Sequence, residues 1–318
     1  MSEKIKEKIK MGKLAVSNSP HIHDKSSTQS IMRDVLIALL PATVAAVVLF
    51  GLKALAMIVV CVTAAVASEF LFNMITKKPQ TVGDLSAAVT GLLLALNLST
   101  KVNLWQCLVG SVFAIVIVKC AFGGIGKNFA NPAITARVFL LIAFTDVAGG
   151  AMTQFAELQT GATPLEVIKG GGDTLPSLLD MFLGNNGGAI GETCSVALLI
   201  GLVYLLVRKV ITWHIPVVYI ATVFVLALAL TQDVNLALYH VLGGGLLIGA
   251  IFMATDYVTS PIRTSGKIVF ALGCAVLTML IRTWGTYPEG VSFAILIMNI
   301  LVPYIDRLCK KKPLGGVK

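Results

Sequence analysis

Charged side chains are scarce in this sequence of 318 residues. They make up 13% of it, against about 25% in soluble domains, while 56% of the residues are hydrophobic. A surface that faces lipid needs few charges, because the hydrocarbon accepts apolar side chains and admits helices that satisfy their own backbone. The composition therefore excludes an ordinary soluble domain and predicts an all-α integral membrane protein.

Sequence signatures of metal and dinucleotide binding are also missing. The six cysteines form no CxxC or other spacing typical of zinc or iron–sulfur ligation, and no Gly-rich dinucleotide fingerprint occurs. We expect the cysteines, most of which lie inside apolar runs, to be small buried hydrophobic side chains. The chain is expected to hold no metal, so NAD and iron–sulfur chemistry would belong to other proteins.

Ten apolar runs are candidates for transmembrane or re-entrant helices, since a full span needs about 20 residues. The third run is short and is interrupted by Gly91, and the eighth contains Gly243-Gly244-Gly245. Asn131 before Pro132 is typical of a helix N-cap with proline in the first turn. The runs are residues 35–52, 54–75, 82–98, 104–122, 132–148, 193–207, 215–230, 236–254, 268–281 and 291–305.

The basic residues indicate an orientation. With the N-terminus in the cytoplasm and ten crossings, 21 of the 25 Lys and Arg lie on the cytoplasmic side, and only Lys53, Lys101, Lys169 and Arg282 lie outside. This is the positive-inside pattern and not a basic patch, so the net charge of +9 does not indicate nucleic acid. No cleavable signal peptide is evident, and both termini are expected in the cytoplasm.

The longest connection divides the runs into two sets of five. We expect a cytoplasmic arm over residues 1–33, a first five-helix half over 34–148, an extracytoplasmic loop over 149–191, a second half over 192–306 and a basic cytoplasmic tail over 307–318. Five segments in each half predict an inverted repeat. Residues 91–95 resemble residues 245–249 and support the repeat, although packing of helices through small residues would also explain these glycines.

Ionisable residues at membrane depth are candidates for an ion pathway, because burying them there is costly. The candidates are Glu69 inside the second run, Asp146 near the outer end of the fifth, and Asp256 at the end of the eighth. Glu192 lies at a helix end. The alternative for each is a helix-end carboxylate in water or a pair with a neighbouring lysine. His21 and His23 would serve docking to a neighbouring subunit rather than metal binding.

One motif in the outer loop indicates chemistry. By composition Thr160-Gly161-Ala162-Thr163 is a turn, yet it resembles the Ser/Thr-Gly-Ala-Thr motif that receives covalent FMN through a phosphoester. That motif belongs to the D subunit of the Rnf complex and the B subunit of the sodium-pumping NADH:quinone reductase. Thr163 corresponds to the acceptor, and Glu157 stands where the motif usually has Asp. Ser19-Pro20-His21-Ile22 and Asn131-Pro132-Ala133 resemble further signatures of this family.

The resemblance implies a membrane subunit of an ion-translocating ferredoxin:NAD+ oxidoreductase, with FMN on Thr163 outside the membrane and no catalytic residue of its own. It also implies a second, non-covalent flavin, either riboflavin or FMN. The implied partners are the A, B, C, E and G subunits of the complex, a flavin transferase and membrane lipid. The implied location is the bacterial or archaeal cytoplasmic membrane.

Three alternatives remain open at this stage. The chain could be a B-type subunit of the related quinone reductase, a flavin-free solute transporter or channel, or a scaffold that docks other subunits. The sequence does not decide between Na+ and H+ as the transported ion.

Overall fold

The computed structural model describes residues 27–144, 163–171, 175–287 and 289–309. Every regular element in these residues is a helix, which confirms the predicted all-α class. The first half contains α2 (Thr28–Phe50), α3 (Leu52–Ile75), η1 (Val82–Asp84), α4 (Ser86–Leu96), α5 (Leu104–Val112), the π-helix η2 (Phe113–Cys120) and α6 (Pro132–Ala143).

Two short helices, α7 (Pro164–Lys169) and α8 (Leu178–Leu183), lie within the predicted outer loop. The second half contains α9 (Ser195–Val207), α10 (His214–Thr231), α11 (Val234–Leu242), α12 (Leu246–Ile248), the π-helix η4 (Gly249–Met253), α13 (Thr264–Trp284) and α14 (Val291–Leu308). Each of the ten predicted apolar runs therefore contains a helix.

Five of the described helices are long and apolar enough to cross a membrane: α2, α3, α10, α13 and α14. A sixth span results if α11 and the α12–η4 segment, which are bent by 59° at a break, count as one. The runs at α4, α5–η2, α6 and α9 are shorter apolar helices. Helix α4 has 11 residues and rises about 16 Å, about half the hydrocarbon thickness. The chain is thus a multi-pass membrane protein in which helix α4 by itself does not reach across the bilayer.

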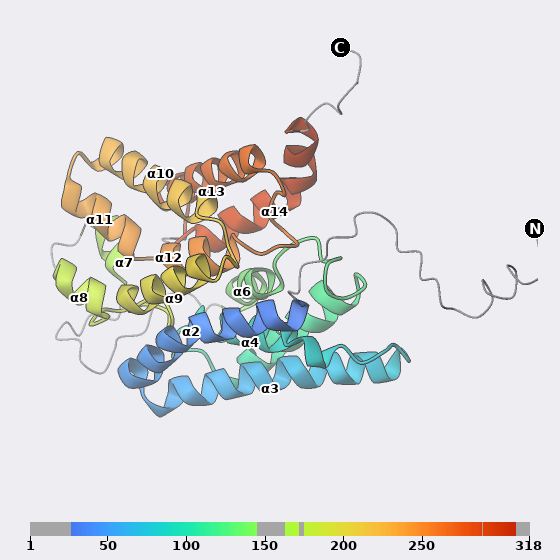
Figure 1. The fold of residues 1–318 in the computed structure, drawn as a ribbon. Helices are drawn as coiled ribbons and strands as arrows, with labels where there is room; N and C mark the ends of the chain where they lie inside the picture. Colours follow the sequence, from blue (N-terminus) through green and yellow to red (C-terminus); the bar gives the residue numbers. More distant parts are fainter. Residues whose placement is uncertain (1–26, 145–162, 172–174, 288, 310–318) are drawn as a thin grey trace, which may run out of the picture.

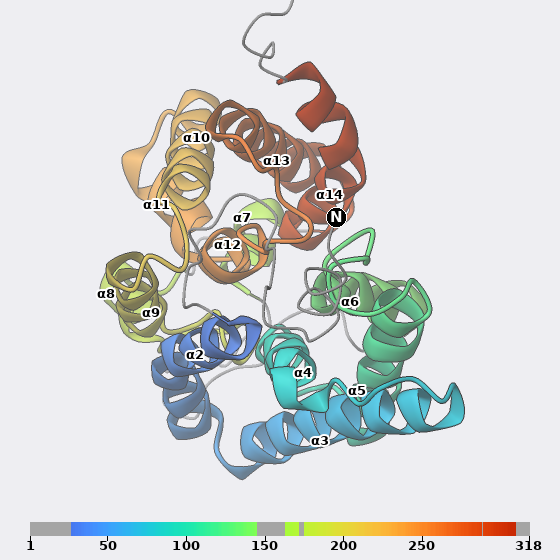
Figure 2. The same cartoon turned by 45° about the vertical axis from the view of Figure 1, so that its right-hand side comes forward.

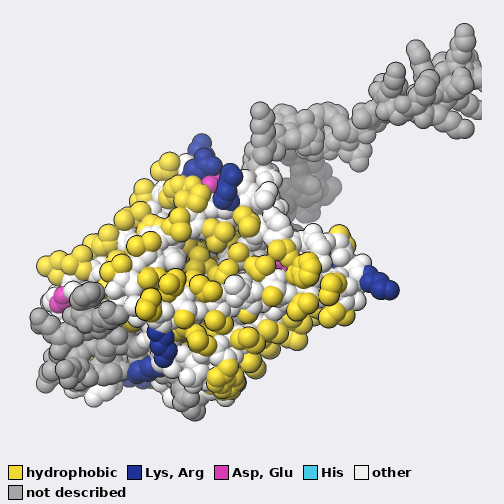
Figure 3. Space-filling view, turned by 90° about the horizontal axis from the view of Figure 1, so that it is seen from below, with side chains coloured by type: hydrophobic (Ala, Val, Ile, Leu, Met, Phe, Trp, Pro, Cys, Tyr) yellow, Lys and Arg dark blue, Asp and Glu magenta, His cyan; other side chains and the backbone are white. Residues whose placement is uncertain are grey.

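The exposed surface agrees with a lipid environment. Figure 3 shows hydrophobic side chains over most of one face, with Lys and Arg at its margins. On α2, for example, Val44 and Val48 are each 60% exposed, and on α3 Leu52 is 81% exposed. Water would oppose such continuous apolar exposure, whereas lipid tails do not.

The helices pack in matching pairs in the two halves. In the first half α3 contacts α4 and α5, and in the second half α10 contacts α11 and α13. Between the halves, α2 packs on α9 and α6 packs on α14. The first segment of one half therefore contacts the first segment of the other, and the fifth contacts the fifth. Figure 2 shows α4 and α12 in the middle of this arrangement. These pairings are those that an inverted repeat requires, and the repeat itself stays a prediction.

The molecule has two opposite ends. Helix α2 begins at one end, called the α2 face, and α7 and α8 lie at the opposite end, called the α7 face (Figure 1). Local signals fix several helix starts, as predicted for α6. Asn131 Oδ1 accepts hydrogen bonds from the N–H groups of Ala133 at 3.0 Å and Ile134 at 3.4 Å, with Pro132 as first residue.

The predicted interruption of the third run at Gly91 is wrong. Gly91 lies inside the continuous helix α4, where a Cβ would be 2.7 Å from the carbonyl oxygen of Cys61. Gly245 instead precedes α12 with a φ of 68°, and the residue in the same place before α4 is Leu85, with a φ of 64°. Residues 91–95 and 245–249 resemble one another in sequence, but Gly91 lies inside a helix and Gly245 lies before one. Close packing of α4 on α3 explains the glycine at position 91.

We expect Gly91→Ala to lower the free energy of unfolding by about 1–3 kcal/mol, because the new Cβ meets backbone of α3 that cannot move aside. Gly83→Ala is the matched control, since a Cβ at Gly83 meets nothing within 4 Å. Thermal unfolding of the purified subunit in detergent measures the difference. Equal melting temperatures for the two variants would contradict the close packing.

The six cysteines are free thiols, and Cys61, Cys107, Cys120 and Cys274 are buried. This confirms the prediction of small buried hydrophobic side chains for these four, while Cys194 and Cys309 are partly exposed.

Candidate functional site

Thr163 is the N-cap of α7 and is 4% exposed. Its Oγ1 accepts a hydrogen bond from the N–H of Glu166 at 3.2 Å, and Glu166 Oε2 accepts one from the N–H of Thr163 at 2.7 Å. Pro164 supplies the first helical residue. Thr-Pro-x-Glu is a sequence signature of this capping box, so the helix start after Thr163 could have been predicted.

The remaining motif residues lie outside the described residues. These are Glu157, Thr160, Gly161 and Ala162, and the same holds for Asp146, for His21 and His23, and for residues 19–22.

Helix α7 is held against the break in the eighth predicted run. A Cβ at Gly244 would lie 2.4 Å from Leu165 Cδ1, so the leucine fills the space that the glycine leaves. Lys169 Nζ donates a hydrogen bond to the carbonyl oxygen of Gly285, after α13. Thr163 is therefore fixed beside the broken helix and the end of α13 through the short helix that it caps.

A cavity of about 340 Å³ opens at the α2 face. Its apolar wall comes from both halves and includes Val35, Leu93, Leu205 and Phe252. The polar groups that line it include Ser86, Thr90, Lys119, Asn128, Asn131 and Asp256.

Asp256, an ion-pathway candidate, lies on this cavity wall just after η4. Thr259 Oγ1 donates a hydrogen bond to Asp256 Oδ2 at 2.9 Å. Burial raises the pKa of the Asp256 carboxyl above its ordinary value, although the Thr259 hydrogen bond opposes the shift. The structure thus places Asp256 at a site that a ligand can reach.

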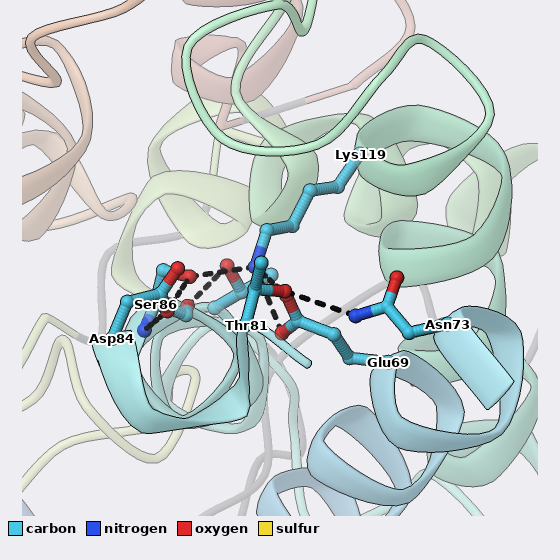
Figure 4. Close-up of polar contacts among 7 residues, drawn as sticks. Glu69, Asn73, Thr81, Asp84, Ser86 and Lys119 are labelled. Atoms are coloured by element: carbon cyan, nitrogen blue, oxygen red, sulfur yellow. Dashed lines mark hydrogen bonds and ion pairs between the residues drawn. The ribbon is translucent and has the colours of Figure 1, made fainter. Parts of the chain in front are cut away.

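Glu69, the second candidate, is in a buried ion pair near the end of α3 that lies at the α2 face. Lys119 Nζ lies 2.9 Å from both carboxylate oxygens of Glu69, and the two side chains are 4% and 1% exposed. Lys119 also donates to Ser86 Oγ at 2.6 Å, as Figure 4 shows. Thr81 Oγ1 donates to Glu69 Oε1 at 2.6 Å, and Asn73 Nδ2 donates to Thr81 Oγ1 at 3.0 Å. The carboxylate therefore has strong donors on several sides.

Sequence reasoning missed Lys119 as the partner of Glu69, because the two are 50 positions apart and Lys119 counted only as a cytoplasmic charge. Lys119 could have been recognised from its position at the end of an apolar run, because a lysine at membrane depth needs a partner of opposite charge. The alternative of a pair with a lysine, left open for Glu69, is the one observed.

A second group of charges lies between the halves, nearer the α7 face. Arg137 of α6 donates to Asn97 Oδ1 at 2.8 Å and to the carboxylate of Glu289. Arg282 of α13 donates to the carbonyl oxygens of Glu289 at 2.8 Å, Gly243 at 3.1 Å and Gly244 at 3.3 Å. Both arginines are 4% exposed, although the sequence count treated them only as charges on one side of the membrane.

Asparagine side chains join the two halves at the centre. Asn97 Nδ2 lies 3.6 Å from Met253 Sδ, and Asn131 Nδ2 donates to the Met253 carbonyl oxygen at 3.3 Å. The end of α4, the start of α6 and the end of η4 therefore meet there.

Together, the fold and these sites define a class: a multi-pass α-helical membrane protein whose two halves enclose a cavity and buried charges, with a capped threonine held at one end. The family follows from comparison with known proteins. The chain belongs to the NQR2, RnfD, RnfE family, whose model matches residues 15–315.

Curated relatives match the chain over nearly its whole length. It is 48% identical to the D subunit of the Na(+)-translocating ferredoxin:NAD(+) oxidoreductase complex of Acetobacterium woodii, over 96% of each chain. It is 40% identical to the D subunit of the proton-translocating ferredoxin:NAD(+) oxidoreductase complex of Clostridium ljungdahlii, over 96% of this chain and 98% of that one. The D subunit of the ion-translocating oxidoreductase complex of Stutzerimonas stutzeri is 39% identical, over 92% of this chain and 93% of that one. The predicted resemblance to the D subunit is thus confirmed.

Proposed function

We propose that this chain is the D subunit of an ion-translocating ferredoxin:NAD+ oxidoreductase complex and carries FMN on Thr163. The observation that supports it best is the 48% identity to a D subunit over 96% of both chains, combined with a Thr-Gly-Ala-Thr motif ending at Thr163. NAD and ferredoxin bind to partner subunits, and a flavin transferase attaches the FMN. The subunit lies in a bacterial or archaeal cytoplasmic membrane, with the α7 face outside.

The surroundings of Thr163 fit an ester to phosphate. Its Oγ1 acts as hydrogen-bond acceptor for the N–H of Glu166, so the hydroxyl hydrogen is not needed for the cap. Esterification replaces that hydrogen and leaves an oxygen that can still face the N–H. Because Thr163 is 4% exposed, the transferase acts before α7 packs or while α7 is displaced.

The bound flavin would supply electron transfer in one-electron or two-electron steps. The residues of this chain supply its position. Thr163 anchors it, Leu165 packs against the broken helix, and Lys169 ties α7 to the end of α13. A tethered group has an effective concentration at its partner that geometry sets, so it does not have to be captured from solution.

The test is the intact mass of the denatured subunit, co-expressed with its flavin transferase. The expected result is a gain equal to FMN minus one water, with flavin fluorescence that stays with the denatured band. An unmodified mass under these conditions would exclude the covalent flavin and favour a flavin-free transporter.

The cavity at the α2 face fits the second, non-covalent flavin. Its volume of about 340 Å³ lies within the range of about 300–1,000 Å³ that small-molecule sites occupy. Apolar walls from Leu93 and Phe252 suit a flat aromatic ring, and Asn128 suits its polar edge. Asn128 Nδ2 donates to the carbonyl oxygen of Ala130 at 3.0 Å, which orients its Oδ1 as an acceptor.

We expect Val35→Trp to fill this cavity and remove the non-covalent flavin, because Val35 lines its wall. Val44→Trp is the matched control, since Val44 lies on the same helix but is 60% exposed. Flavin extracted by acid, which leaves the ester on Thr163 intact, measures the occupancy. Equal extractable flavin in the two variants would place the second flavin elsewhere.

Glu69 and Asp256 remain the described candidates for an ion pathway, both at the α2 face. Asp256 lines the cavity, while Glu69 is closed off behind Lys119. This difference favours Asp256 as the residue that an entering ion contacts first. An ion can reach Glu69 only when the Glu69–Lys119 pair opens.

A further inference from the structure

Buried polar atoms without a hydrogen-bond partner cluster in one short segment of the described chain. Seven such atoms occur, and four of them belong to residues 186–195: Asn186 Oδ1, Glu192 Oε2, Thr193 Oγ1 and Ser195 Oγ. Buried polar groups are nearly always paired with protein or with ordered water, so these oxygens are free to bind a polar ligand or an ion. All four atoms can act as oxygen ligands for a cation.

Glu192 is the charged member of this segment, and it is 5% exposed. Its Oε1 accepts a hydrogen bond from the N–H of Ala189 at 3.0 Å. A Cβ at Gly188 would lie 2.6 Å from this Oε1 and 3.1 Å from Thr193 Cγ2, so the two side chains flank the glycine. The carboxylate is thus enclosed by its own loop, with Thr193 beside it.

The other carboxylate oxygen points to the helix break. A Cβ at Gly245, the residue before α12, would lie 3.0 Å from Glu192 Oε2 and 3.5 Å from Arg137 Nη1. A Cβ here would be tightly packed against the carboxylate, and the φ of 68° is one that glycine adopts without strain. Oε2 therefore faces the gap between the two halves where α11 stops and α12 starts.

The charged side chains of Arg137, Arg282 and Glu289 lie near Glu192. Arg137 of α6 is bonded to Asn97 and Glu289, and Arg282 of α13 is bonded to backbone carbonyls of residues 240, 243, 244 and 289. The hydrogen bonds of both arginines thus go to other groups, and Oε2 stays open as an acceptor.

The loop does not need a carboxylate for its own structure. The N–H groups of Ile190 and Gly191 donate to the carbonyl oxygens of Leu98 at 3.0 Å and Leu96 at 2.8 Å, which holds the loop to the end of α4. A glutamine oxygen could accept from Ala189 equally well. A buried carboxyl group costs more than an amide, so a role that needs its proton or charge explains it better.

We propose that Glu192 binds the transported monovalent cation, a proton or Na+, at the α7 end of the interface between the halves, with the Thr193 hydroxyl as a neighbouring ligand. The proposal rests on the function proposed above. Glu192 is then the counterpart of Asp256 at the α2 face.

The test uses the assembled complex in proteoliposomes, driven by reduced ferredoxin and NAD+. We expect Glu192→Gln to keep the covalent FMN and to lower the number of ions accumulated per electron transferred by at least about tenfold, because an intramembrane carboxylate is lost. Uptake of radioactive Na+ and the response of a pH-sensitive dye are measured in parallel. The ion whose accumulation falls in the variant is the ion that Glu192 binds. Asp233→Asn is the control, because Asp233 is exposed and asparagine also serves as an N-cap for α11.

A second variant protects the test against a folding defect. Thr193→Val keeps the side-chain shape, and we expect it to raise the half-saturating ion concentration of transport severalfold. The role of Glu192 is overturned if Glu192→Gln accumulates ions at the wild-type level. It is also overturned if an assembled Thr193→Val complex has an unchanged half-saturating ion concentration. Either result leaves the subunit assignment intact. Electron transfer without ion accumulation in the wild type would overturn both.

Discussion

Thr163→Asn is expected to abolish covalent flavin on the subunit while leaving α7 in place. Asparagine is as good an N-cap as threonine, so its side chain still accepts the N–H of Glu166. It has no hydroxyl that can form a phosphoester. Intact mass and fluorescence of the denatured subunit measure the adduct, and circular dichroism and assembly measure the fold.

Two further replacements separate the cap from the anchor. Thr163→Ala loses both, so it adds a loss of about 1 kcal/mol of helix stability to the loss of flavin. Thr163→Ser keeps hydroxyl and cap, and is expected to retain flavin if the transferase accepts serine. Electron transfer through the complex should fall to background in the asparagine and alanine variants alike. Covalent flavin that persists in Thr163→Asn would move the attachment point to another residue, with Thr160 the first to test.

Breaking the Glu69–Lys119 pair is expected to have the largest effect on stability. Glu69→Gln leaves the ammonium group of Lys119 buried without a counter-charge, which costs about 3–5 kcal/mol. Lys119→Met leaves the carboxylate unpaired at a similar cost. The double variant removes both charges, and we expect it to recover most of the lost stability, because two neutral side chains of similar size can pack there.

Ion transport by the same variants shows what the pair does. If Glu69 carries ions, the double variant is stable but inactive in transport, and if the pair only holds α3, η2 and α4 together, the double variant regains transport with its stability. Thermal unfolding and ion uptake therefore have to be measured on one preparation. Equal melting temperatures of Glu69→Gln and wild type would contradict a closed ion pair.

Helix positions followed from local sequence to within a few residues in most cases. Apolar runs must become helices in a membrane, and Asn131-Pro132 marks the start of α6 by local capping. Errors arose where a residue's surroundings come from a distant segment. Gly91 looked like a helix break, but the close backbone of α3 explains it, which periodicity does not show.

The buried charges were the least predictable feature. Glu69 could be selected because it lies inside an apolar run, whereas its partner is 50 positions away. Glu192 was placed at a helix end, with a carboxylate in water or a pair with a lysine as the alternatives, and in the structure it is 5% exposed. Whether a carboxylate meets water depends on which helices cover it, and that is a property of the packed structure.

By itself, the sequence determined the membrane class, the helical segments and the motif that ends at Thr163, because each depends on composition or on neighbours along the chain. Only the tertiary structure decided that α7 is held against the broken helix, that Lys119 neutralises Glu69, and that Glu192 faces Gly245 with an open oxygen. The physical reason is that ion pairing, burial and unsatisfied hydrogen bonds arise between segments far apart in the chain, and local sequence carries no record of which segments will meet.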